Sequence, residues 1–208
     1  MMSKIEDYLD ELFPNPKCEL NYSKDYELLI ATVLSAQSTD RQVNKVTKVL
    51  FKNYSSLKKL GNADLVELEN ILRPVGSYHK KAIYVKEIAN KLVNDWNGSV
   101  PKSRESLLEF PGVGRKTINV FLSEFYHEPC FAVDTHVSRV LKRLGIAKHN
   151  DDVYIIEKKA MKKFAREVWG KRHLQIVLFG RYYCKAVKPL CRSCKLFDVC
   201  HEKKKTFY

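Results

Sequence analysis

The chain has 208 residues, enough for one large domain or two small ones with a core that needs no disulfide staples. It carries 37 Lys plus Arg against 24 Asp plus Glu, and the formal net charge of +13 favours a polyanionic partner such as nucleic acid or an acidic membrane surface. No stretch resembles a transmembrane span, and the N-terminus lacks the apolar core of a signal peptide. We therefore expect a cytoplasmic protein that binds no membrane.

Apolar residues recur at helical spacing along the chain, and turn-forming residues separate the runs. We find no convincing period-two strand and no internal repeat, so the predicted class is all-α. Besides the motif described below, helices are expected over residues 4–13, 26–34, 40–50, 56–60, 65–72, 78–96, 135–144, 152–168 and 174–183.

Several expected helix starts carry a side chain that can accept hydrogen bonds from the first free N–H groups. Gln42 follows one of them at capping-box spacing. Another is an aspartate directly before a helix, and a cap is the simplest role for such a residue. The expected capping residues are Ser23, Thr39, Asp64, Ser103 and Asp134.

One proline and two glycines interrupt the helical pattern in the run FPGVGRKT at residues 110–117, which indicates a helix, a tight hairpin and a second helix over about 104–126. Gly112 and Gly114 can take backbone angles that a Cβ forbids, and they let another backbone come close. We expect the N–H groups of Val113, Gly114 and Arg115 to point outward at the start of the second helix. Unpaired N–H groups and the positive end of the helix dipole coincide there and favour a phosphate.

Four of the six cysteines crowd together near the end of the chain. In a reducing compartment such crowding indicates a metal centre rather than disulfides. The spacing C-x6-C-x2-C-x5-C contains only one short knuckle and also differs from ferredoxin patterns, so zinc and a four-iron cluster both remain open. Cys18 and Cys130 lack a partner pattern and are expected to be small buried apolar residues. The four clustered cysteines are Cys184, Cys191, Cys194 and Cys200.

Basic residues lie between and beside these cysteines, and no acidic residue occurs from Gly180 to Lys195. A loop cross-linked by metal would hold the cations in one rigid patch that grips phosphates. The simpler alternative is a structural staple surrounded by solvated side chains, and the two roles are compatible. The basic residues are Arg181, Lys185, Lys188, Arg192 and Lys195.

Three features resemble the endonuclease III family when they are taken in this order: residues 107–120 around the hairpin, the run VDTH at 133–136, and the four-cysteine spacing. The run LSAQSTD at 34–40 resembles a further stretch of that family. The likeness covers roughly residues 21–200. Members of this family are helix-hairpin-helix DNA glycosylases with AP lyase activity.

The resemblance implies a fold of two α-helical domains with a DNA cleft between them. One is a six-helix barrel over residues 22–130 that contains the hairpin motif. The other joins residues 1–21 to 131–208 and holds a [4Fe-4S] cluster in the loop 184–200. The implied partner is double-stranded DNA with damaged bases or abasic sites, and the protein is expected to be a monomer.

By the same resemblance, Lys116 matches the nucleophilic lysine of the family and Asp134 its essential aspartate. The implied reaction removes oxidised pyrimidines and then cleaves 3′ to the abasic site by β-elimination through a Lys116 Schiff base. Gln37 matches a residue that enters the space left by the flipped base. The other expected DNA contacts are Ser77, Tyr78, Gly112, Val113, Gly114, Arg115, His136, Lys185 and Lys188.

One position departs from the family pattern. Ser77 stands where members often have a leucine that wedges into the DNA, and a hydroxymethyl group cannot replace an unstacking apolar wedge. Either Tyr78 or His79 takes over this role, or the lesion preference differs.

Each expected site residue also has a simpler role when it is taken singly. Lys116 is then a solvated surface lysine, Asp134 a helix cap, and Gln37 a cap for the end of its own helix. Three other functions compete with the bifunctional enzyme. A monofunctional mismatch glycosylase of the same superfamily lacks a lysine at this position, and a non-catalytic DNA-binding module does not need the paired Lys116 and Asp134. An electron carrier that uses the cluster needs neither the basic surface nor the hairpin.

Overall fold

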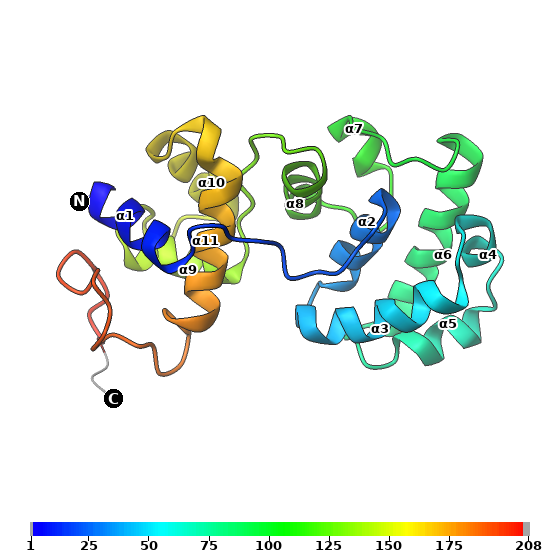
Figure 1. The fold of residues 1–208 in the computed structure, drawn as a ribbon, viewed down its shortest axis with the longest axis horizontal. Helices are drawn as coiled ribbons and strands as arrows, with labels where there is room; N and C mark the ends of the chain where they lie inside the picture. The colour runs from blue at the N-terminus through cyan, green and yellow to red at the C-terminus, as the bar shows by residue number, and fades with distance from the viewer. Residues whose placement is uncertain (1, 206–208) are drawn as a thin grey trace. The chain divides into compact units, whose positions relative to one another are not determined.

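The computed structural model describes residues 2–205, and over these residues the fold is all-helical, as the sequence predicts (Figure 1). The elements are α1 Met2–Leu12, α2 Asp25–Leu34, α3 Asp40–Asn53, α4 Leu57–Gly61, α5 Leu65–Leu72, α6 Tyr78–Asp95, α7 Arg104–Leu108, α8 Arg115–Phe125, α9 Thr135–Arg143, α10 Val153–Lys163, the 3-10 turn η1 Arg166–Val168 and α11 Trp169–Tyr182.

The chain forms two compact units, one of Cys18–Tyr126 and the other of Met1–Lys17 together with His127–Tyr208. In the Cys18–Tyr126 unit, α2 is the central helix and packs against α3, α6 and α8. Nearly all of its side chains are buried, as expected for a helix that is apolar on every side. The long helix α6 runs beside α4 and α5 in the same unit (Figure 1). The loop after the end of α2 and the loop before the start of α6 are therefore each attached to a helix packed in the core.

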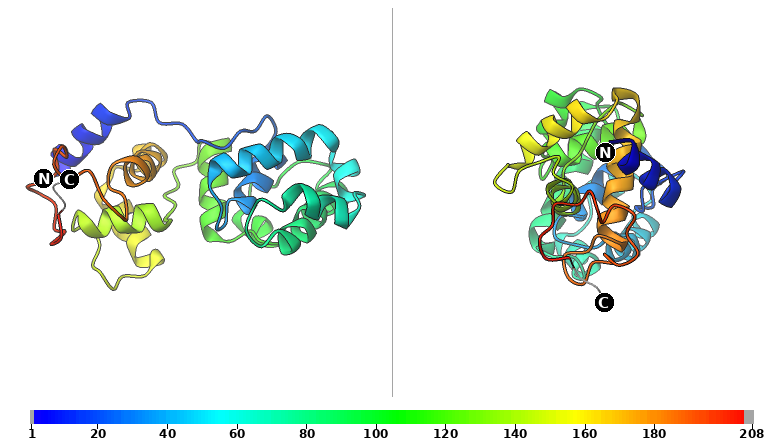
Figure 2. Two further views of the ribbon diagram at one scale, coloured as in Figure 1. Left: turned by 90° about the horizontal axis from the view of Figure 1, so that it is seen from below. Right: turned by 90° about the vertical axis from the view of Figure 1, so that its left-hand side faces the viewer.

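In the second unit, α11 packs between elements from both ends of the chain, because it contacts α9 and also α1. Arg172 of α11 donates to Asp10 of α1 at 2.9 Å, and Lys171 lies 2.7 Å from the same carboxylate. The Arg172 guanidinium holds the pKa of Asp10 well below its usual range. Leu196 of the cysteine loop is fully buried in this core. The loop lies near α1, and Asp198 of the loop pairs with Lys4 of α1 at 2.6 Å (Figure 2).

Four of the five expected caps are confirmed, because Thr39, Asp64, Ser103 and Asp134 each accept from an N–H group of the helix that follows. The expectation for Ser23 is wrong. Helix α2 begins after Lys24, and the N–H of Ser23 instead donates to the Glu27 carboxylate at 2.8 Å. The acid inside the helix thus bonds back to the chain before it.

The expected helix over 152–168 is also wrong at its end, because α10 stops at Lys163. Phe164 takes an extended conformation with ψ of 145° and stacks its ring on Phe131. Trp169 then starts α11, five residues earlier than expected, and its indole N–H donates to the Phe164 carbonyl at 2.9 Å. Burial of one aromatic ring overrides the local helical pattern here.

The two isolated cysteines have no cysteine partner. Cys130 is buried, as predicted, whereas Cys18 is only partly buried. Burial nevertheless raises the pKa of the Cys18 thiol to about 12. No helix within residues 2–205 has the length and apolarity needed to cross a membrane.

Candidate functional site

The hairpin between α7 and α8 forms where the sequence predicts it. Gly112 has φ of +75°, and a Cβ at this position would lie 2.7 Å from Cδ2 of Tyr84 and 3.0 Å from Cγ1 of Val33. Only glycine combines this backbone angle with such close packing. Phe110 and Val113 are buried on either side and anchor the turn in the core.

Two expectations about the turn are corrected. The N–H of Val113 does not point outward, because it donates to the Phe110 carbonyl at 3.1 Å and closes the turn. Gly114 has an extended backbone with φ of −117°, which any residue adopts, and no protein atom lies within 4 Å of an added Cβ. Glycine is thus required by the turn at Gly112, whereas at Gly114 it leaves open space outside the protein.

Helix α8 begins without a side-chain cap and without an acid in its first turn. Among the described residues, the N–H groups of Gly114, Lys116 and Thr117 make no hydrogen bond. Both Gly114 and Lys116 are exposed. Unpaired N–H groups and the positive dipole end make this helix start an anion site. Lys116 lies in the first turn of α8, next to this anion site.

A second group of expected residues meets the hairpin in a pocket of about 230 Å³. Gln37 follows α2, Ser77 precedes α6, and both line this pocket together with Gly112. Gln37 and Ser77 each have φ of 55°, which is left-handed backbone that costs a non-glycine residue on the order of 1 kcal/mol or more. Such strain in two loops that share a pocket is typical of a functional surface.

Tyr78 and His79 lie directly after Ser77. Their rings are in contact, with centroids 4.0 Å apart and planes tilted by 33°, and His79 Nδ1 is 2.8 Å from a carboxylate oxygen of Glu69. The aromatic pair is therefore held to α5 as one body beside Ser77.

Lys81 is a site residue that the sequence analysis missed. It is only 5% exposed, and Nζ lies 2.9 Å from the Leu34 carbonyl and 2.6 Å from the Ala36 carbonyl. These bonds cap the end of α2, so Gln37 is not needed for that role. Burial lowers the pKa of Lys81. The signal in the sequence was a lysine on the buried stripe of the 78–96 helix, three residues after Tyr78.

Asp134 stands at the start of α9 in the second unit and is half-buried. Its Oδ1 accepts from the N–H of Val137 at 2.8 Å, so the capping role is real. Its Oδ2 makes no hydrogen bond with any of residues 2–205. His136 lies against Gly180 of α11, and its Nδ1 is 3.3 Å from an Arg139 nitrogen.

The four clustered cysteines line one pocket, together with apolar residues of the loop and of α11. Arg143 of α9, which the sequence analysis did not single out, donates to Cys184 Sγ at 3.4 Å and to the Lys185 carbonyl at 2.8 Å. Burial raises the pKa of the Cys184 thiol, and the bond from Arg143 acts in the opposite direction. Burial also raises the pKa of the Cys194 thiol. A cationic neighbour of this kind stabilises the thiolates that bind metal.

Within residues 2–205, no three Cys, His, Asp or Glu side chains are placed to share a single metal ion.

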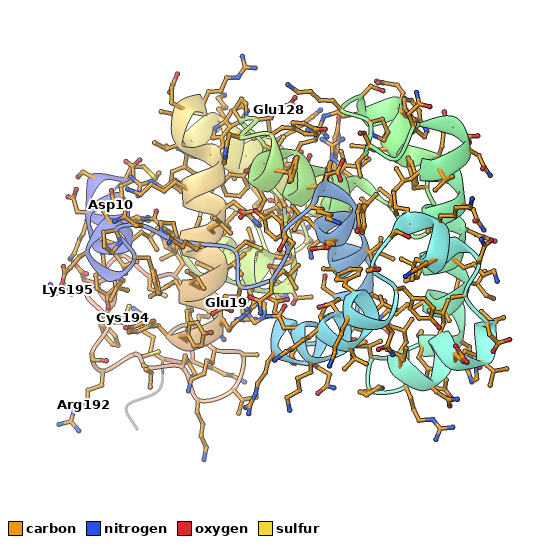
Figure 3. The ribbon with its side chains drawn as sticks, turned by 45° about the vertical axis from the view of Figure 1, so that its right-hand side comes forward. Asp10, Glu19, Glu128, Arg192, Cys194 and Lys195 are labelled. Atoms are coloured by element: carbon orange, nitrogen blue, oxygen red, sulfur yellow. The ribbon has the colours of Figure 1, made fainter. Side chains whose placement is uncertain are left out.

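The basic patch on the cysteine loop is smaller than expected. Lys195 is paired with Glu11 of α1 at 2.6 Å, which ties the loop to that helix rather than leaving a cation for phosphate. Arg192 extends away from the loop, whereas Lys195 and Cys194 lie near α1 (Figure 3). Lys185, Lys188 and Arg192 form no ion pair with any described residue, and Lys188 is exposed with φ of 51°.

Residues 30–166 match the family model of the HhH-GPD superfamily base excision DNA repair protein. Endonuclease III of Bacillus subtilis is 42% identical over 199 residues, which cover 96% of this chain and 91% of that protein. Endonuclease III of Escherichia coli is 39% identical and covers 95% of this chain and 93% of its own length. The fold, the hairpin and these matches define a helix-hairpin-helix protein of base excision repair.

Among solved structures, a trapped endonuclease III–DNA covalent intermediate matches with a TM-score of 0.92 and 44% identity, covering 97% of this chain and 96% of the other. A thermostable thymine-DNA glycosylase at 22% identity has a TM-score of 0.81 and shares the fold. The chain belongs to the endonuclease III family. It is a DNA-binding enzyme, a DNA glycosylase with associated AP lyase activity.

Proposed function

We propose that Lys116 is the nucleophile and Asp134 its catalytic partner, and that the enzyme removes oxidised pyrimidines from double-stranded DNA. The observation that carries this proposal is the start of α8. An exposed lysine occupies the first turn there, beside N–H groups that no described residue engages. A phosphate of the DNA backbone bound by those N–H groups brings a neighbouring sugar within reach of the amine.

The reaction begins when the damaged nucleotide turns out of the stack, because its sugar carbon is unreachable inside the duplex. The neutral amine of Lys116 attacks C1′, and the glycosidic bond breaks so that the base leaves with the bonding electrons and gains a proton. The sugar ring opens as the C1′–O4′ bond breaks. The nitrogen passes one proton to O4′ and keeps the other in a protonated Schiff base with C1′. This linkage acidifies C2′. Loss of a C2′ proton expels the 3′ phosphate and cuts the strand.

Asp134 uses one carboxylate oxygen to cap α9 and has the other available for this chemistry. Oδ1 is held by the N–H of Val137, which fixes the carboxylate, while Oδ2 has no partner among the described residues. A fixed carboxylate stabilises the positive charge that develops on the sugar and carries protons between the amine and the leaving base. Capping and catalysis are therefore two roles of one side chain.

Contacts outside the reacting atoms hold the opened duplex. Gln37 fills the space that the everted nucleotide leaves, and the aromatic rings of Tyr78 and His79 beside Ser77 supply the stacking surface that Ser77 lacks. His136, Lys185 and Lys188 contact the phosphate backbone from the second unit. We assign residues 22–130 to the barrel domain, and residues 1–21 with 131–208 to the cluster domain, of a monomeric enzyme.

The four loop cysteines are proposed to hold a [4Fe-4S] cluster. Four thiols around one pocket and an arginine donating to Cys184 Sγ support a metal centre on these cysteines. The resemblance of the four-cysteine spacing to the family makes that centre a [4Fe-4S] cluster rather than zinc. When bound, the cluster supplies a cross-link that fixes the loop against α9 and α11. The chain's own residues perform the reaction.

Borohydride reduction of the Schiff base tests the catalytic assignment. On duplex DNA with a preformed abasic site, the wild type and a matched surface variant, Lys48→Ala, are expected to form a covalent adduct, and Lys116→Ala is expected to form none. Equal trapping by Lys116→Ala and wild type would remove the lysine assignment. Excision of an oxidised pyrimidine without trapping indicates a monofunctional glycosylase, and binding without either indicates a non-catalytic module.

The cluster has its own test. Purified protein is expected to be yellow-brown and to contain iron and sulfide at about four atoms of each per chain. Colourless protein with one zinc ion per chain would contradict the cluster while leaving the lysine chemistry intact.

A further inference from the structure

A buried lysine joins two loops with left-handed backbone in the Cys18–Tyr126 unit, those of Gln37 and Ser77. Lys81 Nζ carries three N–H donors and has three oxygen partners: the carbonyls of Leu34 and Ala36, at 2.9 and 2.6 Å, and Ser38 Oγ at 3.3 Å. The three acceptors flank Gln37 on both sides, and all belong to the end of α2 and the loop after it.

Ser38 links Lys81 to the loop that contains Gly76 and Ser77. Its Oγ accepts from the N–H of Gly76 at 3.1 Å and from Lys81, and its own O–H lies 3.5 Å from the Ala36 carbonyl. Gly76 directly precedes Ser77. The network thus runs from the residues around Gln37 to the residue before Ser77, and its centre is the ammonium group of Lys81.

Both residues that the network flanks have φ of 55°. Left-handed backbone at a non-glycine residue persists only where the surroundings impose it. Within residues 2–205 no carboxylate pairs with Lys81, and its three bonds all go to neutral oxygens. An ammonium buried without a counter-ion is costly, so its bonds have to be well formed for it to be tolerated.

We infer that Lys81 is a positioning residue that holds the loops of Gln37 and Ser77 in the shape that occupies the gap beside an everted nucleotide. It touches no reacting atom. It acts through the loop carbonyls, and it fixes both loops relative to the hairpin, since Gln37, Ser77, Lys81 and Gly112 line the same pocket. This inference rests on the proposed function, in which Gln37 fills that gap.

A positioning role for Lys81 should affect base excision and Schiff-base formation at an abasic site differently. Excision of a base requires that an intact nucleotide be unstacked and held outside the duplex, whereas an abasic nucleotide has no base to unstack and is everted at a lower cost. Loss of Lys81 should therefore slow base excision much more than it slows Schiff-base formation at a preformed abasic site. A lysine needed only for folding would affect both steps alike.

Helix α6 offers a matched control. Lys86 also donates from Nζ to a backbone carbonyl, that of Ala63 at 2.5 Å, but this bond braces the connection between α4 and α5. Lys81→Met and Lys86→Met each remove one charge and a lysine–carbonyl interaction from the same helix. Ser38→Ala removes one arm of the network without a change in charge, and it keeps the test open if Lys81→Met folds poorly.

The experiment measures single-turnover excision of an oxidised pyrimidine and borohydride trapping on an abasic duplex, with the full-length enzyme. Lys81→Met is expected to slow excision by about tenfold or more, because displaced positioning groups cost rates of that order. Its trapping rate is expected to stay within about threefold of wild type, because eversion of an abasic nucleotide depends less on the gap-filling loops. Ser38→Ala should show the same split with a smaller loss, and Lys86→Met should show no split.

Equal losses in excision and trapping for both Lys81→Met and Ser38→Ala would overturn the inference, because they would leave only a structural role. A split of the same size in Lys86→Met would also overturn it. Failure of the wild type to trap would instead overturn the proposed lyase chemistry, and the inference with it.

Discussion

Helices α8 and α9 begin in opposite ways. Helix α9 starts with a carboxylate, and Asp134 satisfies one of its first N–H groups. Helix α8 starts with Gly114, which offers no side chain, and the N–H groups of Gly114, Lys116 and Thr117 find no partner among the described residues. The start of α9 is bound by a carboxylate of the protein itself, whereas the start of α8 can bind an anion from another molecule.

The difference shows how one local structure can serve two chemical roles. A capped start neutralises the helix dipole and gains rigidity, and in α9 this rigidity fixes a carboxylate with one oxygen to spare. An uncapped start sacrifices that stability and keeps an anion site. Side-chain caps precede α3, α4, α5, α7, α9 and α10, whereas α2, α6, α8 and α11 begin without one.

The largest effect is expected from Asp134→Asn, which keeps the cap and removes the charge. Asparagine caps helices about as well as aspartate, so the midpoint of thermal unfolding should hardly move. Base excision should fall by about 10²-fold or more, because the carboxylate stabilises charge and moves protons. Single-turnover excision and thermal unfolding, measured on the same preparation, check both halves.

Asp152→Asn is the matched control, since Asp152 caps α10 through the N–H of Ile155 at 2.8 Å. That variant should retain wild-type excision. If Asp134→Asn excises bases at the wild-type rate, Asp134 only caps α9. The difference between the two helix starts would then have no bearing on catalysis.

The next test gives α8 the kind of cap that α9 has. Gly114→Asp meets no protein atom within 4 Å and needs no unusual backbone angle. It should raise the free energy of unfolding by a few tenths to about 1 kcal/mol through capping. The same change should weaken duplex binding by about tenfold or more, because hydrogen bonds to a charged group are worth roughly 1.5–3 kcal/mol.

Gly114→Asn separates the two causes of that loss, because it caps without a negative charge. Its binding should fall between that of wild type and Gly114→Asp in a fluorescence titration at fixed salt. Unchanged duplex affinity in Gly114→Asp would show that no phosphate occupies the start of α8.

The two glycines of the hairpin, Gly112 and Gly114, should also differ in how much a substitution changes the free energy of unfolding. Gly112→Ala should lower the free energy of unfolding by about 1–3 kcal/mol, because its Cβ meets Tyr84 at 2.7 Å and its φ is +75°. Gly114→Ala should change that free energy by no more than about 0.5 kcal/mol. Urea unfolding of both variants checks the prediction, and equal losses would contradict it.

Local signals in the sequence predicted most of what lies close together in the chain. Apolar periodicity predicted the helices, and Asp134 was recognisable as a cap from its position before Thr135. Gly112 and Gly114, however, look alike in sequence. Only the packing of Gly112 on Tyr84 and the open space at Gly114 reveal that one serves the turn and the other the surface.

Long-range partners were beyond the reach of such signals. The partners of Lys81 are oxygens at positions 34, 36 and 38, and Arg143 finds Cys184 through the packing of the cysteine loop on α9. A backbone carbonyl has no sequence identity, so no residue pattern announces which lysine will bind it. The break after α10 was missed for a related reason, because the burial of Phe164 against Phe131 depends on tertiary packing.

The smallest effect is expected at Ser77, where α6 also begins without a side-chain cap and with φ of 55°. Ser77→Gly relieves the left-handed strain and should raise the free energy of unfolding by no more than about 1 kcal/mol. Ser77→Ala keeps the strain and removes the hydroxyl, so it is the matched control. Because a hydroxymethyl group is no wedge, excision by both variants should stay within about threefold of wild type. A larger loss in Ser77→Ala alone would show that the hydroxyl contacts DNA, and the uncapped start of α6 would then join that of α8 as a binding surface.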